Sequence, residues 1–482
     1  VELRGVFKKI ENRPMKKGRL LELVQKLGKW ERWHFSQFLD SPYFNKRKDV
    51  IRLWQFLQQA LKSKAVEFNQ EKAFQQVYPQ EVFEESKYYL VTSYLFKLLE
   101  EFLAIQHVRQ QPADMLGYQL KAYQEKKLDA HFQRCFRQLE SRQNKQLRRD
   151  STYFWDRFSL ESEYYRYLGS RTRSGKNNLD QLSEAFDIYF IAEKLKQYCL
   201  QKAHQTVAKK EYSLGLQQEM MDFLAQHEAL LDYPAIAIYY HCYQAISTGE
   251  EYFFKRLLQL IEQYALHFSP SEIRSIYLLA INYGIRQLNT GDPSYNRSMF
   301  ELYRNGVESD YLLENGELSS YTFNNTALLG IKLKEFTYVE SFIKKYHVLL
   351  PKSLQQTICN YTLATLRYEQ KAYPEAMQLL ATFDSNDHLM NLNAKLTLLK
   401  IYYEIEEFDA LESLLESTRV YLNRKEELGY HKPRYKTIIS VAFKLLAIHP
   451  HDQKAKATLK KQVQTIEVIN MRNWFLQQLE QF

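Results

Sequence analysis

The stretch YTLATLRYEQKAYPEAMQLLATF, residues 361–383, joins an apolar helical run to a second amphipathic run through the short turn KAY. Two other segments share this pattern: FNNTALLGIKLKEFTYVESFIKKY (323–346) and AKLTLLKIYYEIEEFDALESLLEST (394–418). Their turn aromatics, Phe336, Tyr373 and Phe408, lie 37 and 35 residues apart. Self-similarity at such a period predicts helical hairpins that stack on their neighbours to bury a continuous core.

Small residues recur inside the expected hairpins, with Ala327 and Ala364 in first helices and Ala376 in a second helix. Small side chains let two helices approach closely, and the turn aromatic then fills the space between hairpins. The pattern resembles the tetratricopeptide (TPR) repeat, including Gly330 in a first helix and a closing Pro351. We therefore predict an all-α protein: a right-handed α-solenoid of TPR-like hairpins, preceded by an N-terminal helical module.

The composition favours the same fold class. The 482 residues include only 14 Gly and 11 Pro, fewer than all-β folds and Gly-rich nucleotide-binding folds need for their turns. Hydrophobic residues make up 45% of the chain, which is enough to bury a core. We interpret the 36 Tyr and 29 Phe mainly as interhelix packing.

The segment GSRTRSGKNN, residues 169–178, is the clearest loop in the chain. It predicts a division into a basic N-terminal helical module, 15–168, and a helical-repeat module, 179–482. Residues 1–14 are interpreted as a disordered arm or as a wrongly assigned start, because Met15 opens a natural-looking N-terminus.

The segment DSPYFNKRKD, residues 40–49, separates two aromatic-rich helical runs and predicts a corner between them. Asp40 and Ser41 are N-cap residue types, and Pro42 suits the first turn of the following helix. We expect Tyr43 and Phe44 to pack the two helices together. Residues 45–48 are then the part of the corner that faces a partner.

The whole chain also resembles a family of uncharacterised all-helical bacterial proteins that pair an FLxSPYFNK corner with C-terminal repeats. The matching residues are Phe38 to Lys46, LENGELSSYTFNN (313–325) and LLKIYYEIEEFDALESLLES (398–417). This resemblance implies the same helical fold and carries no activity with it.

Catalytic signatures are weak. GSRTRSGKN departs from a phosphate-binding loop, because Gly169 is one residue too early, Asn177 replaces the Ser or Thr, and no strand precedes it. The chain contains no HExxH, no GxSxG and no paired-Cys zinc spacing, and its four cysteines lie far apart. No run of about 18 apolar residues occurs. We expect a cytoplasmic protein that is not an enzyme, with no catalytic residue, cofactor, metal site or membrane-inserted segment.

Two functions stay open. The first is a protein-interaction scaffold that binds a protein or peptide through the repeat surface, where Asn side chains can pair with a peptide backbone. Its candidate residues are Asn324, Asn325, Lys332, Asn360, Arg367, Asn393 and Lys400.

The alternative is nucleic-acid binding through the basic N-terminal region. The net charge is +9, and residues 1–65 hold 16 Lys and Arg against 6 acidic residues. Its candidate residues are Lys46, Arg47, Lys48, Arg52, Arg148 and Arg149. The sequence does not indicate an oligomeric state.

Overall fold

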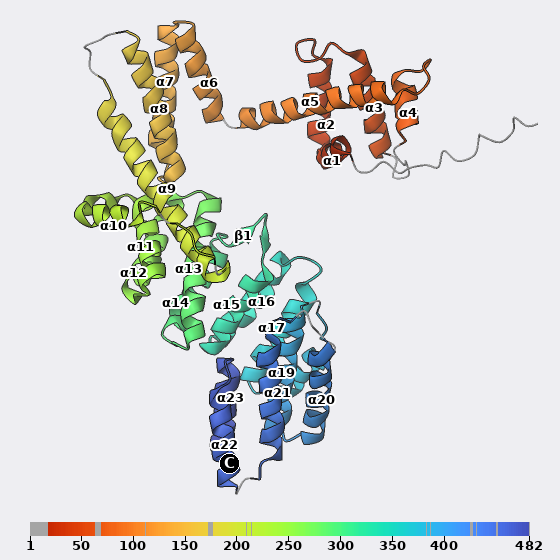
Figure 1. The fold of residues 1–482 in the computed structure, drawn as a ribbon, viewed down its shortest axis with the longest axis vertical. Helices are drawn as coiled ribbons and strands as arrows, with labels where there is room; N and C mark the ends of the chain where they lie inside the picture. Colours follow the sequence, from red (N-terminus) through yellow and green to blue (C-terminus); the bar gives the residue numbers. More distant parts are fainter. Residues whose placement is uncertain are drawn as a thin grey trace, which may run out of the picture. The chain divides into compact units, whose positions relative to one another are not determined.

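The computed structural model describes residues 18–62, 69–110, 112–171, 177–208, 210–213, 215–381, 383–385, 387–424, 428–429, 431–449 and 452–481. The expected arm 1–14 and Met15 lie outside these residues, as does part of the loop 169–178. The described part of the chain forms helices α1 to α23, three short 3-10 helices and one two-stranded ribbon (Figure 1). The prediction of an all-α, helical-repeat fold is therefore confirmed.

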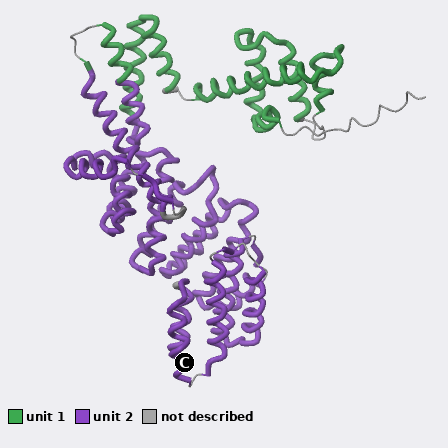
Figure 2. Tube along the Cα trace, in the orientation of Figure 1, with its two compact units in different colours: residues 1–145, 162–177 green, residues 146–161, 178–482 purple. Residues whose placement is uncertain are grey.

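The chain divides into two compact units (Figure 2). Unit 1 comprises residues 1–145 and 162–177, and unit 2 comprises residues 146–161 and 178–482. The chain changes from one unit to the other at three points, and one of them falls in the loop 169–178, where the sequence predicted a boundary. The other two flank the first part of α8 (Ser151–Gly169), so one continuous helix contributes to both units.

Aromatic contacts explain the division of α8. In unit 1, Tyr167 stacks on Phe132 of α7 with ring centroids 4.0 Å apart, and Tyr164 stacks on Phe136 at 4.3 Å. In unit 2, Trp155 contacts Tyr189 of α9 at 5.1 Å, and the hydroxyl of Ser151 donates a hydrogen bond to Glu193.

Unit 1 begins with four short helices and continues with α5, the longest of its helices. Its helices are α1 (Arg19–Lys26), α2 (Lys29–Asp40), α3 (Lys48–Lys62), α4 (Gln70–Val77), α5 (Glu85–Gln110), α6 (Pro112–Glu125) and α7 (Asp129–Lys145). Phe35, Trp54, Phe74 and Phe102 are buried between α2, α3, α4 and α5.

The apolar run 20–39 is two helices, α1 and α2, broken at Leu27 and Gly28. The break changes the helical phase. Trp30 is therefore 56% exposed, whereas Leu21 is buried.

The corner after α2 differs from the prediction at Asp40, Pro42, Tyr43 and Asn45. Asp40 ends α2, and Pro42 lies in a turn rather than in α3, because the Ser41 carbonyl accepts hydrogen bonds from the backbone N–H groups of Phe44 and Asn45. Phe44 does pack on α2, with its ring stacked 4.1 Å from that of Phe38, but Tyr43 is 87% exposed.

Asn45, which we expected to face a partner, is buried and holds the corner instead. Its Nδ2 donates hydrogen bonds to the Leu39 and Arg47 carbonyls at 3.0 and 3.1 Å, and its Oδ1 accepts one from the Arg47 N–H at 3.0 Å. The Asn45 side chain thus provides hydrogen-bond partners for backbone groups of Leu39 and Arg47, which lie where the helical hydrogen bonding of α2 and α3 is interrupted.

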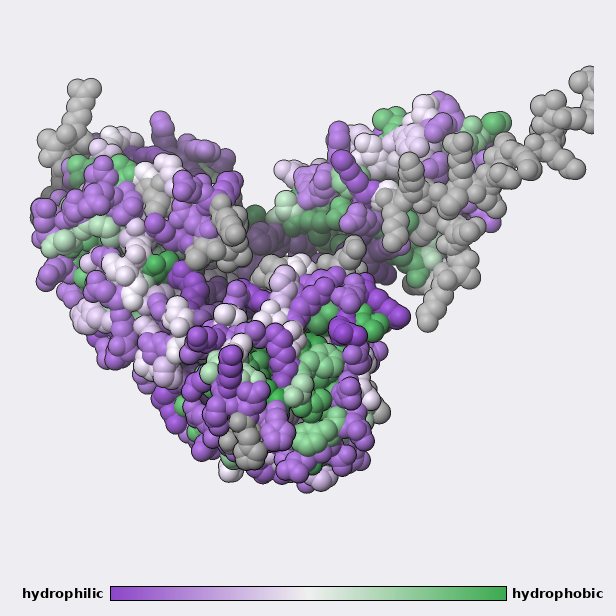
Figure 3. Space-filling view, turned by 60° about the horizontal axis from the view of Figure 1, so that its bottom comes forward, coloured by the Kyte–Doolittle hydropathy of each residue, from purple (hydrophilic) through white to green (hydrophobic). Residues whose placement is uncertain are grey.

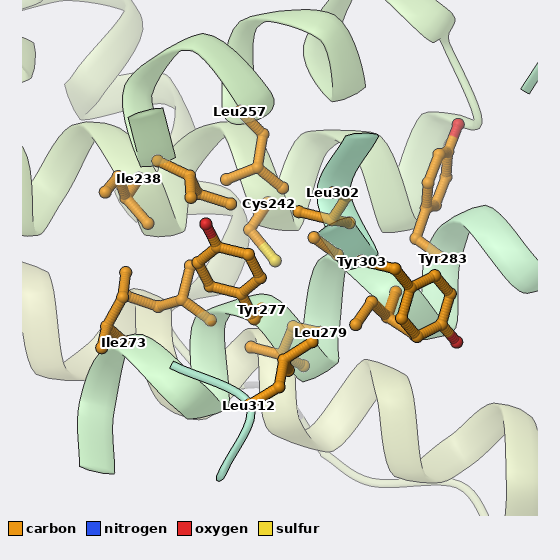
Figure 4. Close-up of a cluster of buried hydrophobic side chains, with 14 of the residues drawn as sticks. Ile238, Cys242, Leu257, Ile273, Tyr277, Leu279, Tyr283, Leu302, Tyr303 and Leu312 are labelled. Carbon is orange, nitrogen blue, oxygen red and sulfur yellow. The ribbon is translucent and has the colours of Figure 1, made fainter. Parts of the chain in front are cut away.

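Unit 2 opens with long helices around one large core. These elements are α9 (Leu179–Ala208), α10 (Gln217–Gln226), η1 (Glu228–Asp232), α11 (Pro234–Thr248), α12 (Glu251–Tyr264), η2 (Ala265–His267), α13 (Pro270–Thr290) and α14 (Tyr295–Glu308). A ribbon of β1 (Leu313–Glu314) and antiparallel β2 (Glu317–Leu318) follows. Figure 4 shows side chains of α11, α12, α13 and α14, among them Cys242, Leu257, Tyr277 and Leu302, converging in this core.

The predicted hairpins follow the ribbon. They are α15 (Ser320–Lys332) with α16 (Phe336–Tyr346), α17 (Gln355–Glu369) with α18 (Tyr373–Ala381), and α19 (His388–Glu404) with α20 (Phe408–Arg424), with η3 (His347–Leu349) after the first. The first helices pack in series, α15 on α17 and α17 on α19. Helices α21 (His431–Ala447), α22 (Gln453–Gln464) and α23 (Ile469–Gln481) complete the described chain.

The small residues have the role that the pattern predicted. Ala327, Ala364 and Ala376 are fully buried. A Cβ on Gly330 would lie 2.6 Å from Val339 Cγ2 and 3.0 Å from the Phe300 ring, so only glycine fits where α15 meets α16 and α14.

We expect Asn45→Ala to destabilise unit 1 by about 2 kcal/mol, because it leaves buried backbone groups without partners. Urea denaturation of the full chain, with hydrogen exchange of peptides from unit 1, measures this change. Tyr43→Ala is the matched control and should alter stability by less than about 0.5 kcal/mol, as exposed positions usually do. Equal effects of the two substitutions would contradict the role assigned to Asn45.

His241 of α11 predicts a pH dependence of stability. It is buried, its Nδ1 has no hydrogen-bond partner among the described residues, and burial, with a smaller contribution from Arg256, lowers its pKa to about 4. The folded pKa lies below the unfolded value, so stability is full above about pH 6.5 and falls as the unfolded chain takes up a proton on the way to pH 4.

Between pH 7 and pH 4.5 we expect His241 to account for a loss of about 2 kcal/mol in the free energy of unfolding of unit 2. Urea denaturation at a series of pH values should show this loss in the wild-type chain, and it should be missing in His241→Gln. Replacing the exposed His227 by Gln is the control. An unchanged pH slope in His241→Gln would disprove the assignment.

Candidate functional site

Unit 2 contains a groove that is a candidate binding site. It encloses about 1360 Å³ and is lined by the first helices α15, α17 and α19, by the turn that follows each of them, and by α21 and α23. The lining includes Lys332, Lys334, Tyr368, Lys371, Asn393, Thr397, Lys400, Tyr403, Glu404, Asn473, Trp474 and Gln477. Figure 3, which brings the C-terminal end of the chain forward, shows hydrophobic strips within a mostly hydrophilic surface.

Glu404, the last residue of α19, organises one side of the groove. Its Oε1 accepts hydrogen bonds from the Tyr368 hydroxyl at 2.6 Å and from the Trp474 indole N–H at 2.7 Å. Its Oε2 accepts hydrogen bonds from Lys371 Nζ at 2.9 Å and from the Tyr373 hydroxyl. One carboxylate therefore ties together two hairpins and α23.

These four bonds decide the charge state of Glu404. Burial alone would raise its pKa, but the hydrogen bonds from Tyr368, Tyr373, Lys371 and Trp474 outweigh that effect and lower the pKa below its ordinary value. Glu404 is therefore ionised at neutral pH, and its bonding capacity is used by the protein itself.

Lys400 lies one helical turn before Glu404 on α19, and it is not paired in this way. Its Nζ is 5.5 Å from the centre of the Tyr368 ring, and it forms neither a salt bridge nor a hydrogen bond with any residue that the structure describes. Burial lowers the pKa of Lys400, although the negative charges of Glu369 and Glu404 favour its charged form. The groove thus contains a partly desolvated cation without a bonded counter-ion.

The structure brings three of the seven predicted peptide-binding residues into the groove: Lys332, Asn393 and Lys400. Asn393 is partly engaged, since its Oδ1 accepts a hydrogen bond from the Tyr435 hydroxyl at 2.7 Å.

The other four predicted residues do not line the groove and have local environments of their own. Asn325 donates to the Tyr303 hydroxyl, Asn360 accepts from Gln356, and Arg367 forms salt bridges with Glu340 and Glu375. The Oδ1 of Asn324 is buried without a partner among the described residues.

Sequence reasoning missed Thr397, Glu404 and Trp474. Thr397 and Glu404 could have been found, because residues 393, 397, 400 and 404 share one face of a helix. Trp474 lies 70 residues beyond Glu404, and no periodic signal links the two.

The predicted nucleic-acid-binding arginines already have partners inside the protein. Arg47 forms two hydrogen bonds with Asp49 and lies over the Tyr94 ring, and Arg52 donates to the Val77 carbonyl.

The other two arginines and the two lysines complete this candidate set. Arg148 binds Asp150, and Arg149 donates to the Gln146 and Arg148 carbonyls. Lys46 and Lys48 are exposed. The four arginines thus support local structure, which leaves the two lysines as the freely exposed members of the set.

The described residues contain no group of three or more His, Cys, Asp or Glu that could hold a metal ion, and none of their helices has the length and apolar character that a membrane span needs. In comparisons with known proteins, no family model, no curated protein and no solved structure matches this chain.

We expect Glu404→Gln to destabilise the C-terminal part of unit 2 by about 2 kcal/mol or more, because an amide N–H₂ would face two hydrogen-bond donors. Hydrogen exchange should show faster opening of α23. The matched control is Glu407→Gln, at the exposed residue directly before α20. It should leave the exchange of α23 unchanged. Normal protection of α23 in Glu404→Gln would refute the central role of this carboxylate.

Proposed function

We propose that this protein is a non-enzymatic protein-interaction scaffold that binds a segment of a partner protein in the groove of its TPR-like repeats. The observation that carries the proposal is the groove itself, which combines aromatic rings, amide side chains and lysines without a bonded counter-ion, of which Lys400 is the least exposed. Specific recognition of a peptide uses such a mixture, since apolar contacts supply affinity and a few polar groups fix orientation.

The composition of the walls supports binding rather than chemistry. The groove's carboxylate with the most hydrogen bonds, Glu404, is bonded to four donors of the protein itself, so it is not poised to exchange protons with a substrate. Asn473 and Gln477 of α23 are exposed at the groove and present amide groups to whatever enters.

Nucleic-acid binding by the basic N-terminal region has less support. Arg47, Arg52, Arg148 and Arg149 bind acceptors within the chain, and a phosphate would have to compete with those contacts. If this alternative held, affinity for a single-stranded oligonucleotide would fall steeply with rising salt and would require Lys46 and Lys48.

A displayed library of random 12-residue peptides, selected on the immobilised full chain, tests the scaffold proposal. Enriched peptides are resynthesised, and their affinities are measured by calorimetry. Gln477→Trp should fill the groove from α23 and weaken binding at least about tenfold, a loss of about 1.4 kcal/mol.

The matched control is Glu480→Trp, which places the same indole at an exposed position of α23 that does not line the groove. It should leave affinity unchanged. Failure to enrich any peptide, or equal binding to both variants and the wild-type chain, would overturn the proposal.

A further inference from the structure

The charges that line the groove do not balance locally. Its cations are Lys332, Lys334, Lys371 and Lys400, and its acids are Glu369, Glu404 and Glu406. Lys371 is paired with Glu404 at 2.9 Å, and Glu404 is saturated by three further donors. Lys332, Lys334 and Lys400 therefore remain against Glu369 and Glu406, so the groove retains an excess of positive charge.

Lys400 differs from the other two lysines in its surroundings. Lys332 and Lys334 are exposed, so water can solvate their ammonium groups. Lys400 is only partly exposed and lies beside the Tyr368 ring, where cation and π-face attract each other but no hydrogen bond from the ammonium is satisfied. A partly desolvated ammonium with free donors gains more from a charge-assisted hydrogen bond than an exposed ammonium does.

The polar side chains one turn before and after Lys400 on α19 already have hydrogen-bond partners of their own. Glu404 cannot turn toward Lys400 without releasing Tyr368, Tyr373, Lys371 or Trp474. The Thr397 hydroxyl, one turn earlier, donates to the Asn393 carbonyl at 3.2 Å. Glu369, the other acid whose charge favours the ammonium, is exposed and forms no salt bridge or hydrogen bond with Lys400. The Lys400 ammonium therefore has donors that an acceptor on a ligand can use.

We propose that Lys400 binds the side-chain carboxylate of a glutamate in the partner segment that occupies the groove. The inference rests on the proposed function and adds the chemistry of the ligand to it. An internal side chain fits better than a chain end, because α15 and α17 line the groove before α19 in the array, and α21 and α23 line it after. A segment that crosses the groove thus passes Lys400 along its length, and glutamate has the reach to meet a recessed ammonium.

Two peptide arrays test this proposal on the full chain. Both carry the same set of 12-residue sequences with amidated C-termini, with glutamate fixed at the centre in one array and glutamine in the other. We expect the strongest binders in the glutamate array. For the best peptide, exchange of glutamate for glutamine should weaken binding to the wild-type chain at least about tenfold, the usual worth of a hydrogen bond to a charged group.

Lys400→Met removes the ammonium and keeps most of the aliphatic stem, and Lys395→Met, on the same helix α19 but outside the groove lining, is the matched control. On Lys400→Met the glutamate and glutamine peptides should differ by less than about twofold, whereas on Lys395→Met the full difference should persist, as a double-mutant cycle requires. Hydrogen exchange of α19 checks that each variant is folded.

The remaining outcomes separate the two proposals. Equal binding of the two arrays would overturn the carboxylate assignment and leave the scaffold function standing. A glutamate preference that persists in Lys400→Met would overturn the role of Lys400. Stronger binding of the glutamine peptide when it is resynthesised with a free C-terminus would overturn the choice of a side chain. No binding of either array to the wild-type chain would overturn the scaffold function and this inference together.

Discussion

The sharp reversal of the chain inside each repeat hairpin is the constraint on which the groove depends. The first helices α15, α17 and α19 are each followed by a residue with a left-handed backbone: Lys334 (φ 61°), Lys371 (φ 62°) and Glu406 (φ 64°). At each position the N–H groups of this residue and of its successor bond back to carbonyls near the helix end, as in the first hairpin, where Lys334 bonds to Ile331 and Glu335 to Gly330. Because the same turn recurs, the first helices pack in series and their faces form one continuous wall.

The left-handed turns also explain a limit of sequence reasoning. The period was legible from Phe336, Tyr373 and Phe408, and the close helix contact from Gly330, because size and spacing are properties of the residues themselves. The turns were predicted, but their left-handed backbone was not, because its residues are Lys, Lys and Glu, whereas glycine or asparagine usually marks a left-handed position. The tertiary packing of the hairpins outweighs this local preference.

The same distinction applies to the N-terminal corner and to the groove. Pro42 suits a first helical turn, but the Ser41 carbonyl and the Asn45 side chain provide a competing set of hydrogen bonds, and these determine the corner. In the groove, Lys332, Asn393 and Lys400 were predicted because polar residues on first helices face one surface. Trp474 was not, since its contact with Glu404 joins segments that share no pattern.

The role of Trp474 has a consequence for the order in which the groove is built. Its indole supplies both a wall of the groove and a hydrogen bond to Glu404, yet α23 follows every helix of the floor along the chain. During synthesis on the ribosome, α15, α17 and α19 therefore emerge and can pack before α23, which lines the other side of the groove, has been made. A nascent chain would have these first helices before α23, so the complete groove forms only when α23 has folded onto α19.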